Sequence, residues 1–343
     1  MLWMTRTPLR VSLFGGGTDY PEYFHRKPGA VVGFAIDKYI HIAALRLNAF
    51  QPYNYRVAYS QLEQVNTVEE IEHPVVREVL KHFNIRDRLD LSIMSDLPAS
   101  GSGLGSSSAF TVGFVKLLHA LQGRTTTKID VARTAVMVER ELLAENVGVQ
   151  DQLHAAFGGI NRFDFHGPQI RITPIQVSGA LLEALSDHLV LVHTGVGRRA
   201  TAAVAAQLEA TRAETIDKDL SELYALVGEC VRLLEGRDGD VLPELGRMLS
   251  ESWFIKRGLS DRVTNDTVDA VFEAVQAHGA YGAKLCGAGG GGFFLALVPP
   301  ERQAALAAAV APLAVIPIDV DVEGTTVIYP ASAPGTGRPL VGC

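Results

Sequence analysis

The sequence of 343 residues contains few cysteines, no long uninterrupted hydrophobic run and no excess of basic residues. Its cysteines, Cys230, Cys286 and Cys343, are widely spaced, which excludes a disulfide framework or a zinc-binding pair and favours a reducing cytoplasm. The longest apolar run, residues 304–318, is broken by prolines, and no signal-peptide pattern is visible, so we expect no membrane association. The net charge of −7 provides no basic footprint for nucleic acid.

A chain of this length exceeds what one hydrophobic core commonly supports, so we predict two domains, at residues 1–175 and 186–330. In the second half, helical patterns are interspersed with strand-like segments at residues 188–193, 282–286, 293–298 and 314–320. The order strand, helices, strand, strand, helix, strand predicts a ferredoxin-like split βαβ unit with an inserted helical bundle. The expected fold class is therefore α/β, of the α+β kind.

The segment between Leu97 and Ala109 is rich in glycine and serine and leads into an apolar stretch that predicts a buried helix to Leu121. Glycines let the backbone approach a ligand closely, and a helix start presents unpaired N–H groups to an anion. No Gly-Lys-Ser/Thr follows the glycines, which excludes a Walker A motif. We predict that the phosphates of a nucleotide are held by Gly101, Gly103, Leu104, Gly105, Ser106, Ser107 and Ser108.

A second helix is predicted to begin at a capping box formed by Thr127 and Asp130 and to run to about Glu145. Its apolar side chains share one face, and Glu139 lies at the border of that face. A carboxylate in this place can be partly buried and directed inward. The alternative is an ordinary exposed helix charge, which is our expectation for Glu145.

Three glycine-containing segments follow one another along the chain: residues 8–20, PLRVSLFGGGTDY; residues 98–109, PASGSGLGSSSA; and residues 284–293, KLCGAGGGGF. With these segments the sequence resembles the GHMP kinases, the superfamily of galactokinase, homoserine kinase, mevalonate kinase and phosphomevalonate kinase. The resemblance spans nearly the whole chain. Within the superfamily, residues 15–21, 106–110 and 149–152 look most like kinases that act on D-glycero-D-manno-heptose 7-phosphate.

The resemblance implies an ATP- and magnesium-dependent sugar kinase with an N-terminal domain like a ribosomal-protein α/β domain and a ferredoxin-like C-terminal domain. It implies transfer of the ATP γ-phosphate to the anomeric hydroxyl of the heptose phosphate, giving a 1,7-bisphosphate. The partner is then a small-molecule sugar phosphate, and the sequence leaves open whether the protein is a homo-oligomer. The alternatives are a kinase for fucose, mannose or galactose, and a sugar- and nucleotide-binding sensor that does not catalyse.

Asp151 and Arg10 are the catalytic candidates. Asp151 matches the acid that follows a Gly-Ile-Met turn in galactokinases, which here is Gly148 to Gln150, and such a carboxylate could orient a hydroxyl and accept its proton. Arg10 matches the basic residue that pairs with this acid in the superfamily and would keep it ionised. Taken alone, the residues also allow a helix N-cap at Asp151 and a solvated strand-end arginine at position 10.

Ser107 and Glu139 are the magnesium candidates, with Ser106 and Ser108 as alternatives to Ser107. A hydroxyl and one carboxylate, completed by waters and phosphate oxygens, suit the octahedral geometry of Mg²⁺. The spacing of Glu139 from Asp151 is similar to that in galactokinases, which supports the choice.

Sugar contacts are predicted in two glycine turns, at Gly16, Gly17, Thr18 and Asp19 and at Gly287 and Gly289. Asp19 matches the acid that binds sugar hydroxyls in galactokinases, although a turn residue is the alternative. Galactokinases carry Glu and His where this chain has Gly16 and Gly17, so the pocket should be larger, as a seven-carbon sugar requires. Candidate contacts to a 7-phosphate are three basic pairs, Arg26 with Lys27, Arg198 with Arg199, and Lys256 with Arg257.

Overall fold

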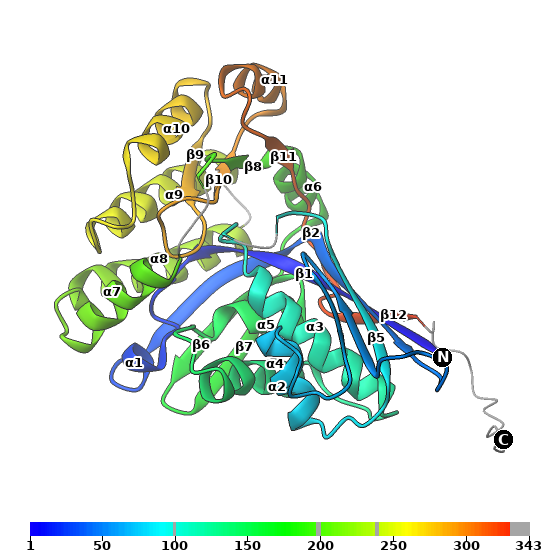
Figure 1. Cartoon of the computed structure of the whole chain (residues 1–343). Coiled ribbons are helices and arrows are strands. Elements are labelled where there is room, and N and C mark those ends of the chain that lie inside the picture. The colour runs from blue at the N-terminus through cyan, green and yellow to red at the C-terminus, as the bar shows by residue number, and fades with distance from the viewer. Residues whose placement is uncertain (99–100, 197–199, 237–239, 330–343) are drawn as a thin grey trace.

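The computed structural model describes residues 1–98, 101–196, 200–236 and 240–329, and it shows two lobes, each built on its own β-sheet (Figure 1). The first sheet and the helices beneath it form the lower lobe in Figure 1, and the second sheet with its helices forms the upper one. Arg198, Arg199 and Cys343 lie outside the described residues.

The first sheet has the strand order β12-β1-β2-β5-β3-β4, and β6 and β7 extend it from the first half of β2. All pairs are antiparallel except β3 with β5. The strands are β1 (Leu2–Phe14), β2 (Gly29–Arg46), β3 (Tyr55–Ala58), β4 (Leu62–Val65), β5 (Leu89–Ser95), β6 (Ile160–His166), β7 (Gln169–Pro174) and β12 (Thr326–Tyr329). The long strands β1 and β2 run through the whole lobe and so link its outer edge to the centre of the molecule.

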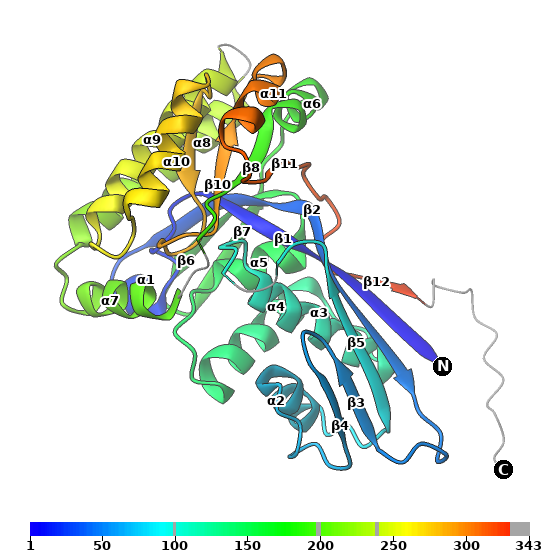
Figure 2. The ribbon, with the colours of Figure 1, turned by 45° about the horizontal axis from the view of Figure 1, so that its top comes forward.

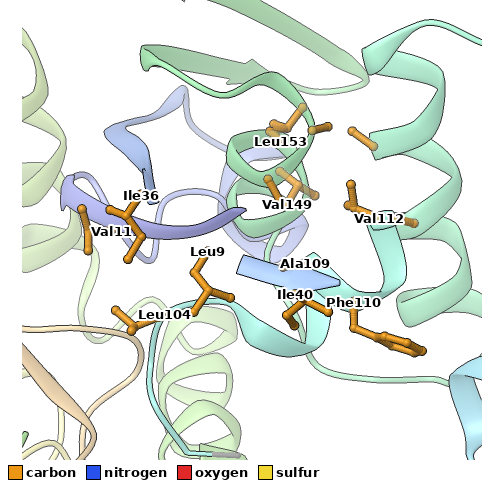
Figure 3. Close-up of a cluster of buried hydrophobic side chains, with 14 of the residues drawn as sticks. Leu9, Val11, Ile36, Ile40, Leu104, Ala109, Phe110, Val112, Val149 and Leu153 are labelled. Atoms are coloured by element: carbon orange, nitrogen blue, oxygen red, sulfur yellow. The ribbon is translucent and has the colours of Figure 1, made fainter. Parts of the chain in front are cut away.

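Helices cover the inner face of this sheet and bury its apolar side chains. Figure 3 shows Leu9, Val11, Ile36 and Ile40 of the sheet opposite apolar residues of α3 and α5. The helices of this half are α1 (Pro21–Phe24), α2 (Pro74–His82), α3 (Ser106–Leu121), α4 (Lys128–Met137), the π-helical turn η1 (Val138–Leu142) and α5 (Gln150–Phe157). Helix α3 is buried on most faces, as its uniform apolar composition predicted.

The second sheet has the order β11-β8-β10-β9 and is antiparallel throughout. Its strands are β8 (Leu189–His193), β9 (Gly282–Leu285), β10 (Phe293–Leu297) and β11 (Val315–Pro317). Four helices, α7 (Ala200–Arg212), α8 (Asp217–Glu235), α9 (Val241–Gly258) and α10 (Asp266–Ala277), are inserted between β8 and β9, and α11 (Pro300–Ala309) connects β10 to β11. The predicted split βαβ unit with an inserted helical bundle is thereby confirmed.

The inserted helices join the two lobes. Helices α8, α9 and α10 lie together beside the second sheet, and α8 also contacts β1 and β2 of the first (Figure 2). The remaining helix, α6 (Gly179–His188), leads from β7 into β8. Strand β12 returns to pair with β1, so the last described strand belongs to the first sheet. The domain boundaries near residues 175 and 186 stay predictions.

The helix predicted from Thr127 to about Glu145 begins as expected but does not continue as a regular α-helix. Thr127 Oγ1 accepts a hydrogen bond from the Asp130 N–H at 3.2 Å and caps α4. After Met137 the chain widens into η1, where the Leu143 N–H reaches back to the Val138 carbonyl at 3.0 Å. A π-turn inserts a residue and rotates the following side chains relative to an α-helix, and such turns are frequent at functional sites.

None of the helices in the described part of the chain combines the length and the apolar character needed to cross a bilayer.

Candidate active site

A cavity of about 560 Å³ lies between the two lobes, and all three glycine-containing segments contribute to its wall. The first lobe supplies the end of β1 with the turn that follows it, the loop before α3 and the start of α5. The second lobe supplies residues of α7, α8, α9 and β9 together with Gly287. Segments that are far apart in the sequence therefore meet at one site.

Arg10 and Asp151 form a bidentate ion pair at this cavity. Arg10 Nε donates to Asp151 Oδ1 at 2.8 Å and Nη2 donates to Oδ2 at 2.7 Å. The third donor, Nη1, binds the Gly103 carbonyl at 2.7 Å, so one guanidinium connects the carboxylate to the glycine loop. Arg10 is 5% exposed, and paired charges of this geometry are held in a fixed orientation.

The two alternative interpretations of this pair are wrong. Helix α5 begins at Gln150 with Val149 as its N-cap residue, so Asp151 lies inside the first turn and its carboxylate points to Arg10. Arg10 is buried rather than solvated, because it lies on the part of β1 where the lobes meet.

The glycine loop fits closely against its surroundings. Gly103 has φ +77°, and a Cβ there would lie 2.6 Å from the Cys286 carbonyl oxygen of the third segment. Gly105 has φ +74° and precedes α3, and its Cβ would lie 3.3 Å from Asp151 Oδ2. Only glycine suits both positions, so the backbone can approach the cavity from the side where α3 begins.

Leu104 has a structural place in this loop. Its side chain is fully buried, with Leu9 nearby in Figure 3, and its carbonyl accepts a hydrogen bond from the Arg10 N–H at 3.0 Å. Leu104 is absent from the cavity lining, whereas Gly101, Gly103, Gly105 and the serines at 106–108 line it. A phosphate contact at Leu104 is therefore restricted to its backbone.

Glu139 is buried in the interior behind the first turn of α3. Its Oε2 accepts hydrogen bonds from Ser108 Oγ at 2.9 Å and from Gln152 Nε2 at 2.6 Å. Its Oε1 is buried and has no hydrogen-bond partner among the described residues. Burial raises the pKa of this carboxyl to about 7. The exposed-charge alternative is wrong, because the π-turn η1 directs the side chain inward.

Asp19 is buried at the base of the first glycine turn. Its Oδ1 accepts from the Gly17 N–H at 3.0 Å and its Oδ2 from the Gln150 N–H at 3.3 Å. Burial, reinforced by repulsion from Asp151, raises the pKa of Asp19 to about 6. A Cβ at Gly148 would lie 2.0 Å from Oδ2, so glycine at 148 is what permits this close approach. Asp19 stabilises the turn and also lines the cavity, where each oxygen retains a lone pair for a hydroxyl.

The other residues predicted to contact the sugar divide into two groups. Gly16, Gly17 and Gly287 line the cavity. Thr18 and Gly289 do not. The hydroxyl of Thr18 donates to the carbonyls of Gly15 and Ala30 at 2.8 and 2.9 Å, which closes the turn. Gly289 has φ +110°, and its Cβ would meet Val263 at 2.7 Å. The residue types at positions 18 and 289 are therefore explained by the conformation of the backbone around them, without a sugar contact.

The expectation that both glycines enlarge the pocket is correct for only one of them. A Cβ at Gly16 would have no neighbour closer than 3.7 Å. At Gly17, with φ +100°, a Cβ would lie 2.7 Å from Gln207 Nε2 and 2.9 Å from Leu220 Cδ2. The side chains of α7 and α8 therefore fill the room at Gly17, whereas the room at Gly16 is open.

The third segment contributes a lysine that sequence reasoning left without a role. Lys284 of β9 is 5% exposed and lines the cavity, and its Nζ donates to the Leu13 carbonyl at 2.5 Å. Burial lowers the pKa of Lys284 to about 8. A lysine in a four-residue strand that is otherwise apolar was the available signal. Ser12, Gln150 and Glu145 also line the cavity, so Glu145 is not simply a solvated charge.

Of the basic pairs considered for a sugar phosphate, one lysine lies at the cavity. Arg26 and Lys27 form ion pairs with Asp217, at 3.3 and 2.8 Å. Arg257 pairs with Asp269 at 3.0 Å. Lys256 lines the cavity, where its Nζ donates to the carbonyls of Leu285 at 2.9 Å and of Gly287.

Comparison with known proteins agrees with this architecture. Residues 66–159 match the GHMP kinases N terminal domain, and residues 240–313 match the GHMP kinases C terminal domain. D-glycero-alpha-D-manno-heptose 7-phosphate kinase of Campylobacter jejuni is 28% identical over 87% of this chain and 90% of its own length. A galactokinase of Pyrococcus furiosus is 27% identical over 87% and 89%.

Solved structures show the same fold. A D-glycero-D-manno-heptose 1-phosphate kinase from Bacteroides thetaiotaomicron superposes with a TM-score of 0.76 at 21% identity, over 95% of this chain and 98% of the other. The two matched domains and their order are those of a family of small-molecule kinases. The chain belongs to the GHMP kinases. Within that family it is an ATP-dependent sugar kinase.

Proposed function

We propose that this kinase phosphorylates the anomeric hydroxyl of D-glycero-D-manno-heptose 7-phosphate and gives the 1,7-bisphosphate. The observation that carries the proposal is the bidentate Arg10–Asp151 pair in a cavity shared with Asp19 and the glycine loop. The Campylobacter jejuni relative, whose name specifies a heptose 7-phosphate, supports the choice of sugar. The open space at Gly16 is consistent with an acceptor larger than a hexose.

Asp151 orients the acceptor hydroxyl and takes its proton as the new O–P bond forms. An anomeric hydroxyl is more acidic than an ordinary alcohol, so an ionised carboxylate is a sufficient base. Arg10 holds Asp151 in a fixed orientation through two hydrogen bonds and adds positive charge where the phosphoryl group passes. Phosphoryl transfer depends mainly on positioning and charge neutralisation, which this fixed pair provides.

The loop from Gly101 to Ser108 binds the ATP phosphates through backbone N–H groups and serine hydroxyls. The N–H groups in the first turn of α3 have no partner within the helix, and they face a cavity that Ser106 and Ser107 line. Gly103 anchors the loop against Cys286, so the cradle is fixed relative to the second lobe.

Glu139 and Ser107 are the residues that would hold Mg²⁺, which supplies charge neutralisation for the phosphates when bound. The buried Oε1 of Glu139 has no hydrogen-bond partner among the described residues, as expected for a carboxylate that ligates a cation. No group of three or more His, Cys, Asp or Glu side chains in the described ranges could hold a metal. The remaining ligands would therefore be hydroxyl, water and phosphate oxygens, which is the set that Mg²⁺ prefers.

Lys256 and Lys284 are the cations that we assign to the phosphate of the acceptor. Both line the cavity, where the Nζ of Lys284 donates to the Leu13 carbonyl and that of Lys256 to the carbonyls of Leu285 and Gly287. The buried thiols of Cys230 and Cys286 are free, which supports a reducing cytoplasm as the place of action.

The test is ADP release with ATP and magnesium across an acceptor panel, followed by ³¹P NMR of each product. The panel contains D-glycero-D-manno-heptose 7-phosphate, the heptose 1-phosphate, mannose, fucose and galactose. Preference for the 7-phosphate with a new anomeric phosphate supports the proposal. Preference for the 1-phosphate, which the name of the Bacteroides protein specifies, would show that the phosphoryl group goes to a hydroxyl other than the anomeric one. Turnover of an unphosphorylated sugar overturns the lysine assignment, and no turnover favours the sensor.

A further inference from the structure

The open space beside Gly16 has a polar wall. The position that a Gly16 Cβ would occupy is 3.7 Å from Gln150 Nε2 and 3.7 Å from Ser12 Oγ. By contrast, a Cβ at the preceding Gly15 would lie 1.9 Å from the Ala30 carbonyl oxygen. A single atom placed in the space at Gly16 therefore has two polar side chains as its nearest neighbours.

Each of the two polar side chains beside Gly16 has one buried atom without a hydrogen bond to the described part of the chain. Ser12 Oγ and Gln150 Oε1 are buried, and neither has a partner among the residues that the structure describes. A buried polar atom without a partner is costly, so such atoms in native proteins are usually completed by water or by a ligand. Ser12 and Gln150 both line the cavity, so a bound ligand is available to complete them.

The same turn of α5 carries the catalytic candidate. Asp151 points to Arg10, and the preceding residue, Gln150, lies beside Gly16. The backbone N–H of Gln150 also donates to Asp19, at 3.3 Å, so the start of α5 is held against the first glycine turn. A sugar bound at Asp151 therefore lies in the cavity that Asp19 and Gln150 also line.

We propose that Gln150 and Ser12 form a subsite that binds one hydroxyl of the acceptor sugar and so determine acceptor specificity. An amide and a hydroxyl each donate and accept, so a sugar hydroxyl between them can satisfy both. Galactokinases carry Met in the position of Gln150 and Glu in that of Gly16. In this chain Gly16 leaves open the space that the Glu side chain would take. Beside that space, the polar Gln150 stands in place of the apolar Met. The inference rests on the proposed function only in requiring that the acceptor is a sugar.

The experiment measures acceptor and ATP kinetics for the wild type, Gln150→Met, Ser12→Ala and the control Gln64→Met. Gln150→Met keeps the side-chain length and removes the amide, and Gln64 undergoes the same change at an exposed position of β4. For the two subsite variants we expect acceptor KM to rise about 10- to 100-fold, as for the loss of one or two hydrogen bonds, with ATP KM within about twofold. Gln64→Met should behave as the wild type.

A series of single-deoxy analogues of the acceptor that the wild type uses separates contact from folding. For one analogue the wild type should lose about as much kcat/KM as Gln150→Met loses with the parent sugar, and Gln150→Met should not distinguish that analogue from the parent. Equal losses on every analogue in both enzymes would overturn the subsite, as would unchanged acceptor KM in both variants. If Gln150→Met does not fold, the same comparison of deoxy analogues is made with Ser12→Ala, and its result supports or overturns the subsite. Absence of any sugar turnover by the wild type would instead refute the proposed function.

Discussion

Ser108 donates a 2.9 Å hydrogen bond to the Glu139 carboxylate, whereas its neighbour Ser107 is exposed at the cavity. Both serines line the cavity, but the Ser108 side chain is buried against Glu139, whereas that of Ser107 is exposed. Gln152 binds the same Glu139 oxygen at 2.6 Å. The two serines therefore have different expected roles: Ser107 as a ligand of the cation, and Ser108 as a residue that positions the other ligand.

This division predicts that Ser107→Ala and Ser108→Ala both weaken Mg²⁺ binding, and that Ser108→Ala alone also lowers stability. Loss of the Ser107 hydroxyl removes one ligand, and loss of the Ser108 hydroxyl releases Glu139, so both should weaken Mg²⁺ binding about 10- to 100-fold. The measurement is Mn²⁺ binding by electron paramagnetic resonance in the presence of ADP, which needs no turnover. Ser108→Ala should also lower thermal stability, because it leaves a buried carboxylate with one donor fewer. Equal Mn²⁺ affinity in both variants and the wild type would contradict the assignment.

Asp151→Asn should lower kcat by about 10²- to 10⁴-fold, because it removes the base while the shape of the side chain is kept. Arg10→Lys should also be strongly impaired, by about 10²-fold or more, since a lysine cannot make the two parallel hydrogen bonds to Asp151 and the third to Gly103. ATP binding, measured by calorimetry, should change little in Asp151→Asn.

A matched control for this pair is Arg56→Lys. Arg56 also pairs with an aspartate, Asp90 at 2.9 Å, but between β3 and β5 and away from the cavity. Its kcat should equal that of the wild type, and full activity of Arg10→Lys would show that the guanidinium geometry is dispensable.

Asp19 should give the reaction a pH dependence in the acidic range. If its ionised form accepts the sugar hydroxyls, kcat/KM for the acceptor should fall about tenfold per pH unit below a pKa of about 6. Asp19→Asn should have a lower kcat/KM that does not fall further as the pH is lowered through 6. The folded-state pKa lies above the unfolded value of 3.8, so ionised Asp19 reduces stability at neutral pH. The variant should therefore be at least as stable as the wild type at pH 7, and an unchanged acidic limb would refute the assignment.

His154 should make the fold sensitive to acid. The ring is buried, neither nitrogen has a hydrogen-bond partner among the described residues, and burial, with Arg10 nearby, lowers its pKa to about 3. The unfolded chain binds a proton near pH 6.5, so the stability that neutral His154 allows is complete above that pH. It is lost as pH falls toward 3, at about 1.4 kcal/mol per pH unit.

The measurement is the free energy of unfolding in urea between pH 7 and pH 4.5 for the wild type and His154→Gln. The variant should lose less stability as the pH falls, with a slope lower by up to about 1.4 kcal/mol per pH unit, the value for one proton. The exposed His82→Gln is the control and should follow the wild type. Parallel curves for the wild type and His154→Gln would show that this ring is not the acid-sensitive group.

The sequence predicted the parts of the site that depend on local chemistry. The glycine loop before α3 and the cap at Thr127 could be predicted because each requires particular residues at fixed spacings. The resemblance added the pairing of Arg10 with Asp151, which no local pattern contains. The π-turn at η1 was missed, because an amphipathic pattern does not reveal one inserted residue. Gln150 and Lys284 were missed because their importance depends on the far lobe and the empty space beside Gly16.

The pairing of β12 with β1 has a consequence for how the chain is made. Met4 lies opposite Tyr329 and Arg6 opposite Thr326, so the outer edge of the first strand is covered by a strand that leaves the ribosome more than three hundred residues later. Throughout translation this edge presents unpaired backbone groups, which are a template for association with other chains. Of the two lobes, the one that holds Arg10 and Asp151 therefore begins first along the chain and is completed last.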